Sequence, residues 1–431
     1  MTHSTVRPLL LLGLISMLAI AAAGCGGSSS DGESRTQTVT VAHAPSPAPP
    51  KPAKGGKPAK AEQGKETGWP FFGRVSQRTH YLPVPVRDLD PPLNQAWSIN
   101  THALIEFPPA ISGGVAYLVN KFGNTQAVRL RDHKVLWQRI IRKRQHGNPL
   151  NVTGPAFHNG RIYLAALGGG LVALDAKDGS EIWKRNLRAH LESSPMVIGK
   201  TLYIGTDSKQ LLALNTDNGR ERWHFDAPAA IKASPSYENG RVYVADYQSA
   251  MFALDAKTGR VIWRSNTAKQ PPYGRGGFYS SPAIAFGRVY AARDDGTVFA
   301  FDKRTGKVAW HFDTGGQVYG SPAVAKVPGT PPTVYIGSEN GRFFALHAGS
   351  GKERWSHDVG GPVPGTATVI DNTVFTSSFK PKLAIGIDVH SHKRTFTFKT
   401  AGYNPIVSNG RKLFLVGYYK LVGLAPQHKS S

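Results

Sequence analysis

The feature that most constrains the fold is a ten-residue segment that recurs along the chain. It reads LDAKTGRVIW at 254–263, and close variants stand at 174–183, 214–223, 301–310 and 346–355. In six successive units a tyrosine lies twenty residues before the closing tryptophan. Self-similarity at a period of about 40–47 residues is typical of repeat architectures, in which one supersecondary unit is stacked many times.

Each unit predicts four short strands. In residues 234–266 they are SPSYE, RVYVAD, MFALDA and VIWRSN. Asn-Gly turns suit the first hairpin, and Asp255 with Gly259 specifies the last one, because Asp accepts turn amides and Gly adopts positive φ. The closing tryptophan offers a large flat surface for the neighbouring sheet. The expected docking tryptophans are Trp97, Trp137, Trp183, Trp223, Trp263, Trp310 and Trp355.

Eight such units predict an all-β fold, an eight-bladed β-propeller of four-stranded antiparallel blades. The eighth unit, from residue 404 onward, has only three strands before the sequence ends. The segment QAWSIN at 95–100 can supply the missing strand. We therefore expect an N-terminal strand to close the ring, which leaves eight complete blades.

The N-terminus predicts export. Arg7 is followed by an apolar run from Leu9 to Ala23 and then by Gly24-Cys25, and Cys25 is the single cysteine of the chain. This is the pattern of a bacterial lipoprotein signal, so we expect residues 1–24 to be a signal peptide and Cys25 to be lipidated. The expected location is the extracytoplasmic face of a membrane, held by the lipid anchor. An ordinary secretory signal is the alternative.

Residues 25–68 are expected to be a tether. They are rich in Pro, Lys and Gly and contain almost nothing to bury. The composition changes at Trp69, where an aromatic-rich segment begins. We expect the propeller domain to span residues 69–431.

The repeats resemble those of the pyrroloquinoline-quinone-type propellers, including the tryptophan-docking pattern D-x-x-x-G-x-x-x-W, as in residues 281–310. The resemblance implies one of two branches. Quinoprotein alcohol dehydrogenases hold the quinone and calcium on the propeller axis, commonly beneath a disulfide of adjacent cysteines, which this sequence lacks. The BamB-like envelope lipoproteins are non-catalytic and bind a barrel-inserting partner.

We expect a non-catalytic protein-binding scaffold for cell-envelope assembly or maintenance, without cofactor or metal. A quinone-dependent dehydrogenase and a binder of anionic cell-wall polymer are the alternatives. The expected partners are an envelope protein or that polymer, and the membrane through the lipid anchor. Nucleic acid is not an expected partner. The protein is expected to be a monomer. Two polar clusters, Asp294-Asp295-Gly296 and His390-Ser391-His392, are expected to form turns rather than ligand sites.

The expected binding face is the one that carries the connections between blades and the turns between second and third strands. The net charge of +24 favours anionic partners. Basic groups interleaved with aromatic ones suit an anionic polymer or an acidic protein surface, and a merely solvated positive rim is the alternative. The predicted residues are Lys121, Arg139, Arg142, Lys143, Arg144, His146, Lys269, Tyr273, Arg275, Phe278, Tyr279, Lys380, Lys382, Tyr418, Tyr419 and Lys420.

Overall fold

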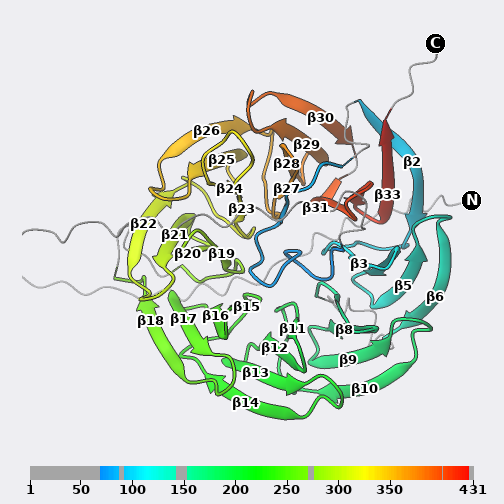
Figure 1. The fold of residues 1–431 in the computed structure, drawn as a ribbon, viewed down its shortest axis with the longest axis vertical. Coiled ribbons are helices and arrows are strands. Elements are labelled where there is room, and N and C mark those ends of the chain that lie inside the picture. The colour runs from blue at the N-terminus through cyan, green and yellow to red at the C-terminus, as the bar shows by residue number, and fades with distance from the viewer. Residues whose placement is uncertain (1–67, 87–91, 142–152, 270–275, 400, 427–431) are drawn as a thin grey trace, which may run out of the picture. The chain divides into compact units, whose positions relative to one another are not determined.

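The computed structural model describes residues 68–86, 92–141, 153–269, 276–399 and 401–426 (Figure 1). All of them belong to one unit, Lys60–Ser431, of the two into which the chain divides. The described residues form β-strands and turns. Within this part of the chain, no helix has the length and apolar character needed to cross a bilayer.

The predicted eight-bladed propeller is confirmed, because the strands form eight sheets around one axis (Figure 1). Blade 1 contains β3 (Ala110–Ser112), β4 (Val115–Val119), β5 (Asn124–Arg129) and β6 (Lys134–Ile140). Blade 2 contains β7 (Ala156–His158), β8 (Arg161–Ala165), β9 (Gly170–Asp175) and β10 (Glu181–Asn186). Blade 3 contains β11 (Met196–Ile198), β12 (Thr201–Gly205), β13 (Gln210–Asn215) and β14 (Glu221–Asp226). Blade 4 contains β15 (Ser236–Glu238), β16 (Arg241–Ala245), β17 (Ala250–Asp255) and β18 (Val261–Asn266).

The other four blades continue this order. Blade 5 contains β19 (Ala283–Ala285), β20 (Arg288–Ala292), β21 (Thr297–Asp302) and β22 (Val308–Asp313). Blade 6 contains β23 (Ala323–Ala325), β24 (Thr333–Gly337), β25 (Arg342–His347) and β26 (Glu353–Asp358). Blade 7 contains β27 (Thr368–Ile370), β28 (Thr373–Ser378), β29 (Leu383–Asp388) and β30 (Arg394–Lys399), with β1 (Tyr81–Leu82) parallel to β27. Blade 8 contains β31 (Ala401–Ser408), β32 (Leu413–Gly417), β33 (Lys420–Pro426) and β2 (Leu93–Asn100).

The N-terminal strand closes the ring as predicted. β2 pairs antiparallel with β33, with Trp97 opposite Gly423. The core clusters lie between neighbouring blades, where the apolar residues of the second and third strands are buried. The first strand of the ring and the last strand of the chain are therefore held in a single sheet.

The strand order gives the molecule two faces. In each blade the strands A, B, C and D run antiparallel from the axis outward, so the A–B and C–D turns lie on one face. The B–C turns and the D–A connections between blades lie on the other. We call these the turn face and the loop face.

The recurring motif joins each blade to the next. Trp183 donates its indole N–H to the carbonyl of Thr216 at 2.8 Å. The same ring covers Gly219, whose φ is +67° and where a Cβ atom would lie 2.8 Å from the indole. Four other tryptophans repeat the hydrogen bond to the following blade, namely Trp137, Trp223, Trp263 and Trp310. These tryptophans, predicted to dock neighbouring blades, each pack on the glycine turn of the next blade.

Two blades replace that glycine by histidine. Trp97 stacks on His133 with ring centroids 4.3 Å apart, and Trp355 lies 5.3 Å from the ring of His392. Both histidines have positive φ, 61° and 58°. His390-Ser391-His392 thus forms the C–D turn of blade 7, as the sequence predicted, and His392 packs on a docking tryptophan.

Residues 69–82, here called the axial segment, fill the centre of the ring (Figure 1, blue). The middle amide of the inner strand donates to a carbonyl of this segment in six blades: Ile111 to Trp69, Phe157 to Pro70, Tyr237 to Ser76, Ile284 to Gln77, Val324 to Thr79 and Val369 to His80. Inner strands have a partner strand on one side only, so these amides would otherwise be unpaired. The axial segment satisfies them.

The small residues that begin each blade form a second ring of bonds about the axis. The Ser194 hydroxyl accepts the amide of Gly154, and the Ser234 hydroxyl accepts the amide of Ser194. The series continues through the hydroxyls of Ser281, Ser321 and Thr366. A small hydroxyl residue is required at this position because it must approach the backbone of the preceding blade.

Candidate functional site

The centre of the loop face is lined by one residue from each B–C turn. We call this set the mouth ring; it contains Lys121, Leu167, Asp207, Tyr247, Asp294, Glu339, Phe379 and Tyr418. The backbone fixes most of these positions, because the amide of the mouth residue donates to a D–A connection. Asp207 donates to His190 at 3.0 Å, and Tyr247 donates to Ala230 at 2.8 Å. The ring is thus built by the repeat, while its chemistry differs from blade to blade.

One side of the mouth holds a carboxylate network. The Glu192 carboxylate accepts from Lys232 at 2.9 Å and from the Tyr279 hydroxyl at 2.7 Å. The Lys232 ammonium also lies over the Tyr247 ring, 5.0 Å from its centroid. Glu192 and its partners join the D–A connections that follow blades 2, 3 and 4. These three connections are therefore held to one another by side-chain hydrogen bonds at the mouth.

Burial raises the pKa of Glu106, Asp207 and Glu339. Lys121 opposes this shift at Glu106, and Lys232 opposes it at Asp207. Burial also raises the pKa of Tyr279, to which the charge of Glu192 adds. Acidic side chains thus lie around the mouth, Asp207 beside this network and Glu106 and Glu339 near Tyr403 on the other side, where the sequence predicted a basic surface.

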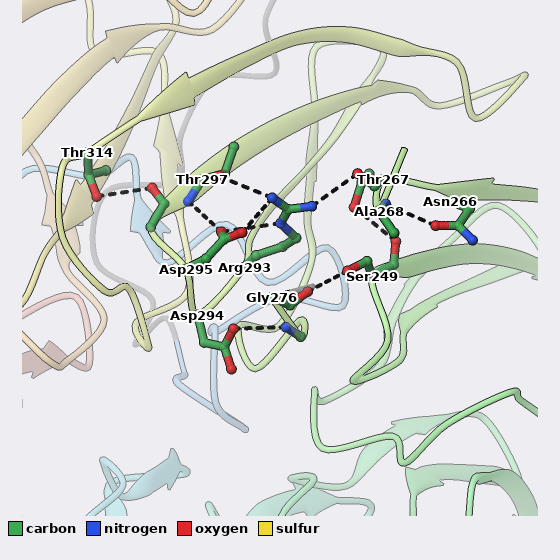
Figure 2. Close-up of polar contacts among 12 residues, drawn as sticks. Ser249, Asn266, Thr267, Ala268, Gly276, Arg293, Asp294, Asp295, Thr297 and Thr314 are labelled. Atoms are coloured by element: carbon green, nitrogen blue, oxygen red, sulfur yellow. Dashed lines mark hydrogen bonds and ion pairs between the residues drawn. The ribbon is translucent and has the colours of Figure 1, made fainter. Parts of the chain in front are cut away.

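The connection between blades 4 and 5 is fixed by buried polar contacts (Figure 2). The guanidinium of Arg293, fully buried, donates to Asp295 at 2.5 Å and to the carbonyl of Thr267 at 3.0 Å. Asp294 accepts the amide of Gly277 at 2.8 Å. The prediction that Asp294-Asp295-Gly296 forms a turn is confirmed, and both carboxylates are used within the protein.

The other side of the mouth is aromatic and basic. The Phe379 ring stacks on Tyr403 at 4.9 Å and lies 5.9 Å from Tyr418, which meets Tyr419 edge to face. Lys382 lies over Tyr418 at 5.1 Å, and Lys420 lies over Tyr419 at 5.6 Å. We call these six residues the aromatic–lysine cluster. Tyr419 remains 46% exposed, so the cluster presents a large ring to solvent.

The structure brings only part of the predicted face together. Lys382, Tyr418, Tyr419 and Lys420 belong to the aromatic–lysine cluster, and Lys380 is an exposed residue close to Lys382 in sequence. Lys121 and Tyr279 lie at the mouth, and Lys269 is exposed on the connection that follows blade 4. Six predicted residues lie outside the described part of the chain: Arg142, Lys143, Arg144, His146, Tyr273 and Arg275.

Two predicted residues lie elsewhere. Phe278 is 0% exposed and packs against Phe299 and Phe301, so it anchors its connection in the core. Arg139 lies on the outer strand β6, and its methylene groups cover Gly179 in the C–D turn of blade 2. Sequence reasoning also missed the acidic residues of the mouth. Aligning the repeats on their B–C turns would have shown Asp207, Asp294 and Glu339 at one equivalent position.

The axis itself carries a buried arginine. Arg78 is 0% exposed, and its guanidinium donates to the carbonyls of Pro235 at 2.7 Å, Ser194 at 3.2 Å and Phe72. Burial lowers the pKa of Arg78 to about 9, which leaves it protonated at neutral pH. Arg78 ties the axial segment to blades 3 and 4.

The axial residues do not fit the quinone and calcium that the dehydrogenase branch holds on this axis. At the level of the inner strands the axis is occupied by residues 69–82, which are hydrogen-bonded to the inner strands of six blades. Among the described residues, no group of three or more His, Cys, Asp or Glu side chains is arranged to hold a metal ion. Asp294 and Asp295, the nearest acidic pair in the sequence, already accept hydrogen bonds from the Gly277 amide and the Arg293 guanidinium.

Solved structures share this fold at low sequence identity. BamB from Moraxella catarrhalis is 16% identical with a TM-score of 0.61, over 79% of this chain and 99% of that one. A europium-containing methanol dehydrogenase is 15% identical with a TM-score of 0.67, over 81% and 89% of the two chains. The computationally designed Ika8 protein is 12% identical with a TM-score of 0.63, over 77% and 99%. These likenesses show the fold alone, since an enzyme, an assembly factor and a design share it.

Comparison of the sequence with known families identifies a family, whereas the structural likenesses show the fold alone. No curated protein matches the chain. The family model of the outer membrane protein assembly factor BamB matches residues 121–234, 168–276 and 229–421, which together cover most of the propeller. With the tryptophan pairing and eight closed blades described above, the conclusion is that this chain belongs to the BamB family of propellers.

Proposed function

We propose that the protein is a non-catalytic, lipid-anchored scaffold that binds a protein partner in cell-envelope assembly or maintenance. The observation that carries the proposal is the aromatic–lysine cluster on the loop face. Aromatic side chains with cations above them supply large rigid contact area, and such residues dominate the energetics of protein interfaces. Tyr419 and Lys382 are exposed at the top of this cluster.

The surroundings of the cluster support a protein partner over a small substrate. The mouth ring beside it carries acidic groups at Asp294 and Glu339, so a partner surface with both charges would complement the loop face. The contacts that stack the rings on one another leave few rotamers to be lost on binding, which lowers the entropic cost of association.

The lipid anchor and envelope location rest on Cys25 and the leader before it, together with membership of the BamB family. Forty-three residues (26–68) separate the proposed anchor at Cys25 from Trp69, where the propeller domain begins. This length would let the propeller reach a membrane-embedded partner from the anchor point.

The proposal is tested by purifying the full-length lipoprotein from its own membranes with its bound proteins. The variant Tyr418→Ala/Tyr419→Ala removes one partly exposed and one exposed ring and should lower the recovery of one stoichiometric partner at least about tenfold. The matched control is Tyr237→Ala, which removes a partly exposed tyrosine on the turn face. Equal recovery from all three proteins would contradict the assignment of the cluster, and the absence of any stoichiometric partner from the wild type would contradict the scaffold function.

A further inference from the structure

A second site lies on the turn face, close to the propeller axis. A cavity of about 410 Å³ is formed there by the axial segment together with the inner strands and A–B turns of blades 1 and 2. Its wall includes four apolar residues, Pro70, Val75, Ile111 and Phe157. Among the described residues that line it, none is acidic, and Arg74 is the one with a permanent charge.

The guanidinium of Arg74 has few partners within the protein. It donates through Nη1 to the backbone carbonyl of Tyr81 at 3.0 Å, and its side chain makes no other hydrogen bond to a described residue. Its Nε is buried and has no acceptor. Burial lowers the pKa of Arg74, and the group that opposes this shift is the phenol of Tyr81 rather than a carboxylate. In the described part of the chain, this partly buried cation therefore has no counter-ion.

The neighbouring arginine of the axial segment shows the opposite arrangement. The guanidinium of Arg78 is fully buried and donates to three backbone carbonyls. Arginine carries five N–H donors and stays protonated, so a buried guanidinium without acceptors is unfavourable. One short segment thus satisfies Arg78 with carbonyls of the protein and leaves most donors of Arg74 without acceptors beside a cavity.

The backbone holds Arg74 in one position. Its φ is +69°, a conformation that is unfavourable for any residue with a side chain. The amide of Arg74 donates to the carbonyl of Phe71 at 2.9 Å, and the amide of Val75 donates to the carbonyl of Gly73 at 2.9 Å. These bonds fix the turn, and the bond to Tyr81 orients the guanidinium. The side chain is therefore in place before a ligand arrives, which lowers the entropic cost of binding.

The composition of the cavity indicates the class of ligand. A guanidinium matches a carboxylate with two parallel hydrogen bonds, and a single cation balances a single negative charge. The apolar wall can cover an apolar body attached to that carboxylate. The volume of the cavity is within the range of small-ligand sites.

We propose that this cavity binds a small carboxylate with an apolar body, and that Arg74 binds the carboxylate group. The site is on the face opposite to the aromatic–lysine cluster. The inference goes beyond the proposed scaffold function and does not depend on it.

The test measures binding of phenylacetate to the chain from residue 26, which keeps every described residue, since these begin at residue 68. Phenylacetate should cause saturable shifts in the NMR signals of the amides of Ser112, His158 and Asn159, which line the cavity. Phenylacetamide has the same apolar body without the charge and should bind at least about tenfold more weakly. Inorganic phosphate, which has no apolar body, should also bind more weakly than phenylacetate.

Variants of the arginine separate recognition from general attraction. Arg74→Gln keeps a donor for the Tyr81 carbonyl but removes the charge, and it should weaken phenylacetate binding at least about tenfold. The matched control Arg304→Gln removes an exposed cation from the C–D turn of blade 5 on the same face, and it should change the affinity no more than about twofold. Phenylacetate should raise the melting temperature of wild type and of Arg304→Gln, but not that of Arg74→Gln.

Thermal unfolding without phenylacetate checks that each variant is folded. If Arg74→Gln does not fold, Arg74→Lys provides the comparison, because an ammonium keeps the charge without the planar fork and should weaken binding at least about threefold.

Three results would overturn the proposal. The first is the absence of a saturable shift at the cavity. The second is equal affinity for phenylacetate in wild type and Arg74→Gln, or equal affinity of wild type for phenylacetate and phenylacetamide. The third is tighter binding of inorganic phosphate than of phenylacetate, because the cavity would then take a hydrophilic anion. None of these results concerns the loop face, so the Tyr418→Ala/Tyr419→Ala variant remains a separate test of the scaffold function.

Discussion

At the residue scale, the propeller is assembled by one contact repeated between blades. In five blades the tryptophan at the end of the motif packs directly on a glycine of the next blade, where no side chain intervenes. At Gly259 a Cβ atom would lie 2.7 Å from the Trp223 ring. The positive φ of Gly259 and its lack of a side chain are thus two separate requirements.

These requirements can be separated by experiment. Gly259 and Gly240 have almost the same φ, 75° and 77°, but a Cβ at Gly240 would meet nothing within 4 Å. Alanine at either position costs about 1–2 kcal/mol for the left-handed conformation. Gly259→Ala should lose about 1–3 kcal/mol more, because the methyl group collides with Trp223. Denaturant unfolding of both variants measures the difference, and equal losses would show that the tryptophan contact imposes no constraint.

The axis contains the residue with the clearest dependence on pH. His80 is buried against Phe72, and burial with the charge of Arg78 lowers the pKa of His80 from 6.5 to about 3. The unfolded chain takes up a proton at this histidine below pH 6.5, whereas the folded protein does not. The folded state therefore loses stability as the pH falls from about 6.5 toward 3.

The variant His80→Asn isolates this contribution. Asn tolerates the positive φ of 52° at this position and does not titrate. Between pH 7 and pH 5 the wild type should lose about 2 kcal/mol more free energy of unfolding than the variant. Chemical denaturation at the two pH values provides the measurement. The same pH dependence in both proteins would mean that His80 is protonated in the folded state.

The sequence predicted the tryptophan pairing well and the axis poorly. The motif is periodic, and the turn hydrogen bonds of its Asp, the positive φ of its Gly and the flat ring of its Trp can each be inferred from the local sequence. Nothing local distinguishes Arg78 or His80 from the other polar residues around them. Their burial follows from blades more than a hundred residues away in sequence, such as the one that supplies Pro235.

At the element scale, the axial segment completes the inner strands. A propeller built only from repeats would leave a row of unpaired amides around its channel. Residues 69–82 supply carbonyls to these amides from an irregular backbone that has no repeat of its own. The sequence predicted order from Trp69 onward because the segment is aromatic, but it could not predict this course through the ring.

Removal of the axial segment should expose these amides selectively. In a chain that begins at residue 83, the amides of Tyr237, Ile284 and Val324 should exchange at least about a hundredfold faster than in the full chain. Amides of the second and third strands, such as that of Tyr243, should keep their protection because their ladder partners remain. Hydrogen exchange resolved by residue tests this, and unchanged protection of the inner amides would show that the segment is dispensable.

At the scale of the whole molecule, the two faces differ in chemistry. The loop face combines acidic groups around the mouth with the aromatic–lysine cluster, and the turn face carries Arg129, Arg131, Arg411 and Lys412 around a cavity between blades 8 and 1. The eight-bladed fold was predicted from the period of the repeat and the missing strand of its last unit. The charge of each face was not predicted from the sequence. The sign of the charge at the mouth depends on single positions whose residue type the repeat does not fix.

The most direct test of the scaffold function is photo-crosslinking in intact cells. A photoreactive amino acid replaces Tyr419 on the loop face or Lys200 on the turn face, both exposed positions of the full-length lipoprotein. The account predicts one dominant protein adduct from position 419 and none of that adduct from position 200. It also predicts that Tyr418→Ala weakens the adduct at 419. The same protein adduct from both positions, or no protein adduct from 419, would contradict a partner-binding loop face.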